Sequence, residues 1–184
     1  GKGTTCLPGG WRGVGDRRRK GKALREGVWQ LQTIEVRGVG IGRDKEVDHP
    51  PAGGGAGMVL KADVVGPALD EARRGTPVDP RAWPVIYMSP RGKPLTQAMA
   101  QEFRKAEGMT ILCGRFEGVD ERVLEEYNVQ EVSLGDFVLT GGEIAAQALI
   151  DATVRLLPNV LGNAASTQEE SHSNGLLEHP QYTK

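Results

Sequence analysis

Three bends rich in glycine or proline follow apolar runs, and their residue types are suited to binding a ligand. They are Ser89-Pro90, Gly114 with the residues after it, and Leu139 to Gly142. Glycine allows backbone to approach a ligand closely, so such bends can offer N–H and C=O groups to a bound molecule. In open α/β sheets, ligands bind outside the carboxyl ends of the strands. The pattern therefore predicts one pocket formed by the three bends.

Strand and helix patterns alternate along the chain, and they predict how these bends are positioned. Helical periodicity or composition predicts helices at 22–27, 62–74, 96–105, 120–127 and 142–157. The last of these has an expected apolar stripe of Ile144, Ala148, Leu149, Ala152 and Leu156. Strands are expected at 28–36, 85–88, 109–113, 129–133 and 137–140, with a turn at 89–92 and an irregular segment over residues 1–20. The alternation predicts an α/β fold with a largely parallel sheet.

Composition excludes several classes of protein. The 184 residues are 38% hydrophobic and 26% charged, which is typical of a globular domain. With a net charge of −1, any contact with nucleic acid must come from local basic clusters, of which Arg17 to Lys22 is the clearest. No apolar stretch is long enough for a membrane span. The cysteines, Cys6 and Cys113, are far apart, so we expect no disulfide framework and a cytoplasmic location.

The glycine-rich loops do not match the common nucleotide or metal motifs. Gly38 to Gly42 lacks the G-x-G-x-x-G order, and the chain has no G-x-x-x-x-G-K-[ST] phosphate loop. His49, His172 and His179 have no cysteine at ligand spacing, so we predict no metal site from these residues.

Ordered motifs give a more specific indication. Val85 to Gly92, Leu112 to Arg122 and Ser133 to Glu143 resemble the bacterial tRNA (guanine-N1)-methyltransferase family. Pro51 to Met58 and Leu161 to Tyr182 agree, so the resemblance covers about residues 21–184. It implies a SPOUT-class α/β domain with a parallel sheet and a deep C-terminal trefoil knot, and a homodimer with the active site at its interface. It also implies transfer of a methyl group from S-adenosylmethionine to N1 of guanine 37 in tRNA, next to the anticodon.

The resemblance implies roles for matching positions. Glu117 matches a family residue near the substrate base, where it could help to bind magnesium, and we group it with the donor site. The expected donor-binding residues are Tyr87, Met88, Ser89, Pro90, Gly114, Glu117, Leu134, Gly135, Asp136, Phe137, Val138, Leu139, Gly141 and Gly142. Backbone groups in an apolar slot suit adenine, which agrees with this set.

Catalysis at guanine N1 requires removal of a proton and stabilisation of negative charge on the base oxygen. By the resemblance, Glu170 is the base and Arg155 is the donor to the oxygen. Many family members have Asp where this chain has Glu170. A structural alternative for Arg155 is a helix ion pair with Asp151, four residues earlier.

Domain boundaries follow from the same comparison of motifs. We expect residues 1–162 to form the methyltransferase domain, and 163–184 to be an interdomain loop and the start of a truncated tRNA-binding domain. Two alternatives stay open: a SPOUT enzyme that methylates a ribose 2′-hydroxyl, and a non-catalytic RNA-binding fragment.

Overall fold

The computed structural model describes residues 2–7, 19–39, 46–158, 160, 180 and 182–183, with backbone only for 2–7, 19–21 and 39. Its helices are α1 (Arg19–Arg25), α2 (Ala62–Arg73), α3 (Gln97–Lys105), α4 (Glu121–Glu126) and α5 (Glu143–Val154), with a 3-10 turn at Val36–Val39. Its strands are β1 (Lys2–Leu7), β2 (Gln30–Glu35), β3 (Asp48–His49), β4 (Val59–Leu60), β5 (Val85–Pro94), β6 (Gly108–Cys113) and β7 (Gln130–Ser133).

A five-stranded parallel sheet organises the described chain, with the order β2-β1-β6-β5-β7. β3 and β4 form a separate antiparallel pair. The expected α/β fold with a parallel sheet is therefore confirmed. Because neighbouring strands run the same way, the carboxyl ends of β5, β6 and β7 meet at one edge of the sheet, next to one another.

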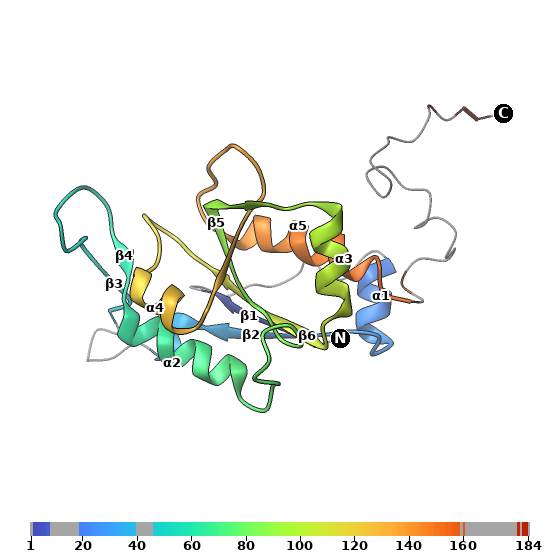
Figure 1. The fold of residues 1–184 in the computed structure, drawn as a ribbon, viewed down its shortest axis with the longest axis horizontal. Helices are drawn as coiled ribbons and strands as arrows, with labels where there is room; N and C mark the ends of the chain where they lie inside the picture. Colours follow the sequence, from blue (N-terminus) through green and yellow to red (C-terminus); the bar gives the residue numbers. More distant parts are fainter. Residues whose placement is uncertain are drawn as a thin grey trace.

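Helices cover both faces of the sheet (Figure 1): α2 lies on one face, and α3 and α5 lie on the other. The side chains of β5 alternate between these faces. Tyr87 belongs to the core cluster under α2, whereas Ile86 and Met88 belong to the cluster under α3 and α5. Burial on both faces explains why β6 is apolar except for Thr110 and has no exposed residue.

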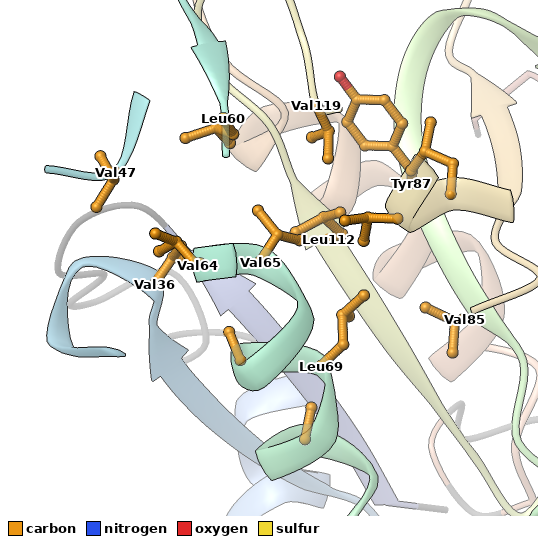
Figure 2. Close-up of a cluster of buried hydrophobic side chains, with 14 residues drawn as sticks. Val36, Val47, Leu60, Val64, Val65, Leu69, Val85, Tyr87, Leu112 and Val119 are labelled. Carbon is orange, nitrogen blue, oxygen red and sulfur yellow. The ribbon is translucent and has the colours of Figure 1, made fainter. Parts of the chain in front are cut away.

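The core under α2 is built mainly from branched aliphatic side chains (Figure 2), among them Val64, Val65 and Leu69 from the helix and Leu112 from β6. Val64, Val65 and Leu69 are fully buried. Tyr87 lies at the edge of this cluster beside Val119, with its hydroxyl directed away from the α2 side chains. The core therefore ends at the same edge of the sheet as the predicted pocket.

Local signals predicted several elements well. The predicted strand at 28–36 is present as β2, and the predicted helices at 62–74 and 96–105 are present as α2 and α3. Thr96 is the N-cap of α3, because its Oγ1 accepts a hydrogen bond from the Met99 N–H at 3.2 Å.

The prediction of an irregular segment over 1–20 is wrong for Lys2–Leu7, which form β1. This strand pairs with β2 on one side and with β6 on the other, so it lies inside the sheet. Backbone pairing along both edges stabilises a strand whose own sequence has little apolar alternation. Residues 8–18 lie outside the described part of the chain.

One prediction near the bends is also wrong. Residues 137–140 form no strand but a loop in which Val138 is 82% exposed, because this segment returns toward β6 instead of running along β7. β5 continues through the predicted turn at 89–92 to Pro94, but its register against β7 is broken there. Met88 and Lys93 both pair with Val132, so residues 89–92 bulge out and the expected bend lies within the strand.

The predicted apolar stripe of α5 is wrong in part. Ile144 is 60% exposed, whereas Leu149 is fully buried as expected. The buried residues of this helix are Ala145, Ala146, Leu149, Thr153 and Val154. The apolar side chains of α5 point to nearly every side of the helix. The periodicity of the sequence therefore could not identify which side packs against the sheet.

Candidate active site

A cavity of about 410 Å³ opens at the carboxyl ends of β5, β6 and β7. Its walls are the three bends that the sequence predicted. Every predicted donor-binding residue except Asp136 lines it: Tyr87, Met88, Ser89, Pro90, Gly114, Glu117, Leu134, Gly135, Phe137, Val138, Leu139, Gly141 and Gly142. The structure thus brings together residues that are 55 positions apart in the chain, from 87 to 142.

The first wall is the middle of β5. Tyr87, Met88 and Ser89 are buried, and the Ser89 Oγ accepts a hydrogen bond from the Arg91 N–H at 3.2 Å. Burial raises the pKa of the Tyr87 hydroxyl, and the negative charge of Glu131 adds to that effect. Tyr87 is therefore a neutral phenol at physiological pH, suited to packing against an uncharged ring.

The second wall begins where β6 ends at Gly114. A Cβ at this position would lie 2.7 Å from the Cε2 and hydroxyl atoms of Tyr87, closer than any ordinary contact. Only glycine lets the Tyr87 ring lie directly over the end of β6. The chain then continues through Phe116, a non-glycine residue with a φ of 60°, whose side chain is 55% exposed. Backbone strain of this kind is concentrated at functional sites.

The third wall is the segment 134–142, which returns from β7 to the end of β6. The Gly142 N–H donates a hydrogen bond to the Gly114 carbonyl at 3.0 Å, and Gly141 forms a bridge with Arg115. A Cβ on Gly142 would lie 3.0 Å from the Cys113 Cα, so the two backbones touch here. This contact closes the side of the cavity and leads directly into α5.

Ion pairs surround the cavity mouth, and sequence reasoning missed them. Arg115 Nη2 lies 2.7 Å from Glu143 Oε1, and the Glu143 side chain is only 13% exposed. On the other side, Arg91 Nη2 lies 2.9 Å from Glu121 and 3.4 Å from Glu131. These pairs join residues at least 28 positions apart, so no local pattern could have indicated them.

The two predicted catalytic residues are not brought to the cavity within the described chain. Glu170 lies outside the described residues. Arg155 is the C-cap of α5, whereas the cavity lies at the other end of that helix. Since α5 has 12 residues, its two ends are about 18 Å apart. The Arg155 N–H bonds the Asp151 carbonyl, as helix geometry requires.

Other predictions have mixed outcomes. Asp136 is exposed and does not line the cavity. Most side chains of the basic cluster Arg17 to Lys22, and the boundary at 162–163, lie outside the described residues. Within the described residues, no three His, Cys, Asp or Glu side chains gather as they would around a metal ion, and no helix there could cross a membrane.

The amino-acid sequence is similar to those of known proteins. The sequence profile of the family described as "tRNA (Guanine-1)-methyltransferase TrmD" matches residues 10–184. The chain belongs to this family. It is 63% identical over 180 residues to a "tRNA (guanine-N(1)-)-methyltransferase" of Ruegeria sp. (strain TM1040). That alignment covers 98% of this chain and 72% of the relative.

Other members of the methyltransferase family are similarly close. A protein of the same name from Cereibacter sphaeroides (strain KD131) is 69% identical over 164 residues, covering 89% of this chain and 66% of the relative. One from Brucella ovis is 55% identical over 164 residues, covering 89% of this chain and 65% of the relative. The chain therefore spans about two thirds to three quarters of the length of these methyltransferases.

Proposed function

We propose that this chain forms the methyl-transfer domain of a tRNA (guanine-N1)-methyltransferase, and that it moves a methyl group from S-adenosylmethionine to N1 of guanine 37 in tRNA. One observation carries the proposal. In a chain of this family, the strand-end cavity is lined by the residues that the family resemblance assigns to the methyl donor.

The cavity has properties that suit S-adenosylmethionine. Its volume of about 410 Å³ falls within the range of small-molecule sites. Two of its walls are closely packed backbone, because an added Cβ at Gly114 would collide with Tyr87 and one at Gly142 would press on the Cys113 backbone. In this proposal the segment 134–139 and the Tyr87 wall hold the adenosine, and Gly141 flanks it. The bound donor supplies an electrophilic methyl group on a positively charged sulfur.

The protein must accept the proton of guanine N1 and stabilise the negative charge on guanine O6. Transfer would form the bond from guanine N1 to the methyl carbon while the bond from that carbon to sulfur breaks, and S-adenosylhomocysteine would leave. The N1 proton must also leave, and negative charge moves toward O6. We assign the proton to the Glu170 carboxylate and the stabilisation of O6 to the Arg155 guanidinium. Glu117 and Glu121 are the described carboxylates that line the cavity, and we assign the substrate contact to Glu117.

A second copy of the chain would complete the site. Arg155 lies a full helix length from the cavity of its own chain, so another copy is the simplest source of this group near the donor. Exposed apolar side chains line the cavity or follow it directly in the chain: Phe116, Phe137 and Val138 of the lining are 55%, 53% and 82% exposed, and Ile144 at the start of α5 is 60% exposed. Clustered exposed apolar residues are typical of an interface, and we propose a homodimer whose active sites lie there.

We also propose that the segment after β7 forms the trefoil knot of the SPOUT class. Its support is the return of residues 134–142 from the edge strand to the end of β6, with the bond between Gly142 and Gly114.

The test is a product analysis. The chain is incubated with S-adenosylmethionine and an unmodified tRNA transcript that carries guanine 37, and the nucleosides are separated by mass spectrometry. We expect 1-methylguanosine, and none from a matched transcript with adenine at that position. A 2′-O-methylated nucleoside would assign the chain to ribose methylation. Tight tRNA binding with no methylated product would identify a binding fragment and overturn the proposal.

A further inference from the structure

The loop 51–58 and the strand after it are bonded to the segment 117–120, part of which lines the cavity. Its last residue, Met58, accepts a hydrogen bond from the Glu117 N–H at 3.0 Å. Leu60 then donates to the Gly118 carbonyl at 2.9 Å and forms a bridge with Val119. The loop is therefore attached to the segment that carries Glu117 into the cavity wall.

Within this loop, Gly57 faces the Glu117 side chain. A Cβ on Gly57 would overlap Glu117 Cγ, lie 2.5 Å from its Oε1 and lie 2.8 Å from its Cδ. Gly57 also has a φ of 90°, a backbone conformation that favours glycine. The Glu117 side chain therefore lies against the Cα of Gly57 and occupies the space where any other residue would have its Cβ.

The nearest Glu117 atom to a Cβ at position 57 is Cγ, and this determines how the side chain must move. Cγ is the second carbon of the Glu117 side chain, so it moves away only by rotation about χ1. Such a rotation carries the carboxylate, two bonds further out, away from its present place on the cavity lining. Rotation about χ2 or χ3 of Glu117 would not relieve the overlap, because it leaves Cγ in place. A methyl group at position 57 would therefore change where the Glu117 charge lies.

We infer that Gly57 is a positioning residue, which acts by allowing Glu117 to present its carboxylate at the mouth of the donor cavity. This inference rests on the proposed function where it concerns methyl transfer, since Glu117 is there the carboxylate that contacts substrate. The contact between Gly57 and Glu117 is a separate claim that can be measured without activity.

The same loop offers a matched control. Gly54 also has a positive φ, of 78°, and is exposed, but a Cβ there would meet nothing within 4 Å. Gly54→Ala and Gly57→Ala therefore introduce similar backbone strain, and only Gly57→Ala meets Glu117. Both substitutions are made in the native chain and in a Glu117→Ala background, where the colliding atoms are absent.

The first measurement is thermal unfolding, which needs no substrate. Gly57→Ala should unfold about 2–4 °C below Gly54→Ala in the native background, because of the added overlap. In the Glu117→Ala background the two variants should unfold at the same temperature. Equal midpoints in the native background, or a gap that persists without the Glu117 side chain, would overturn the contact.

The second measurement is kcat/KM for methylation of tRNA. We expect Gly57→Ala to lose about 100-fold, since a misplacement of about 1 Å can cost that much, and Gly54→Ala to stay within about twofold of the native chain. Adding Gly57→Ala to Glu117→Ala should cause no further loss. An equal loss from Gly57→Ala in both backgrounds would mean general loop damage and would overturn the positioning role. If the native chain methylates nothing while the unfolding difference is present, the proposed function fails and the contact stands.

Discussion

Gly142→Ala tests whether the segment 134–142 is held against β6 as a wall of the cavity. The residue has helical angles, φ −74° and ψ −6°, at which alanine is normally favoured by about 0.4–1 kcal/mol. Here the new Cβ would lie 3.0 Å from the Cys113 Cα and 3.2 Å from the Gly114 N. Ordinary contacts are about 3.5–4.0 Å, so the wall must move by about 0.5 Å.

That movement has two costs. It strains a packed backbone contact, at about 1–3 kcal/mol, and it stretches the 3.0 Å hydrogen bond from Gly142 to Gly114, at about 0.5–1.5 kcal/mol. After the usual gain from alanine is subtracted, the free energy of unfolding should fall by about 0.5–4 kcal/mol. The displaced wall should also raise the Kd for S-adenosylmethionine about tenfold, which equals about 1.4 kcal/mol.

Urea unfolding and titration calorimetry measure these two effects. Gly38→Ala is the matched control, because a Cβ there would meet nothing within 4 Å. Because Gly38 lies in the 3-10 turn Val36–Val39, this change should raise the unfolding free energy by at most about 1 kcal/mol and leave the Kd unchanged. If Gly142→Ala behaves like Gly38→Ala in both assays, the contact between the segment and β6 does not shape the cavity.

Three other predictions follow from particular residues. Glu170→Gln should lower single-turnover methylation by about 10²–10⁴-fold while the calorimetric Kd for the donor stays nearly unchanged, and a full rate would refute its role as the base. Burial, aided by a hydrogen bond to Asp70, raises the pKa of the Tyr127 hydroxyl from 10.0 to about 12. The folded state therefore favours the neutral phenol, and this stability is fully present below pH 10 and lost as pH rises to about 12. The stability difference between the native chain and Tyr127→Phe should be constant below about pH 9 and shrink toward pH 11 in urea unfolding, and a difference that grows would contradict it. Thr96→Ala removes the N-cap of α3 and should lower the unfolding free energy by about 1 kcal/mol without changing the donor Kd, and an unchanged unfolding midpoint would show that the cap contributes nothing.

The sequence predicts those elements whose signals are local. α3 has its cap and its apolar face within one short segment, and β6 is apolar throughout except for Thr110. By contrast, β1 depends on pairing with β2 and β6, which lie far along the chain, and its own pattern is weak. The buried face of α5 depends on what packs around an almost uniformly apolar helix, which periodicity cannot supply.

In the candidate site too, features with local signals could be predicted from the sequence, and features that join distant segments could not. The glycine and proline bends are local features, so they predicted the cavity walls correctly, although Ser89-Pro90 lies within β5 and the strand expected before Leu139 to Gly142 is absent. The charged pairs Arg115–Glu143 and Arg91–Glu121 depend on the meeting of distant segments, and they became visible only in the structure. The same holds for the contact of Gly57 with Glu117, which joins residues 60 positions apart.

A crystal structure of the chain with S-adenosylhomocysteine, the demethylated donor, tests most directly whether the three strand-end bends form the donor site. We predict that the nucleoside occupies the cavity between Tyr87, Gly114 and the segment 134–142, with its base bonded to backbone groups of that segment. Density for the nucleoside at another place on the chain, with these three bends unchanged and uncontacted, would contradict the assignment of the cavity.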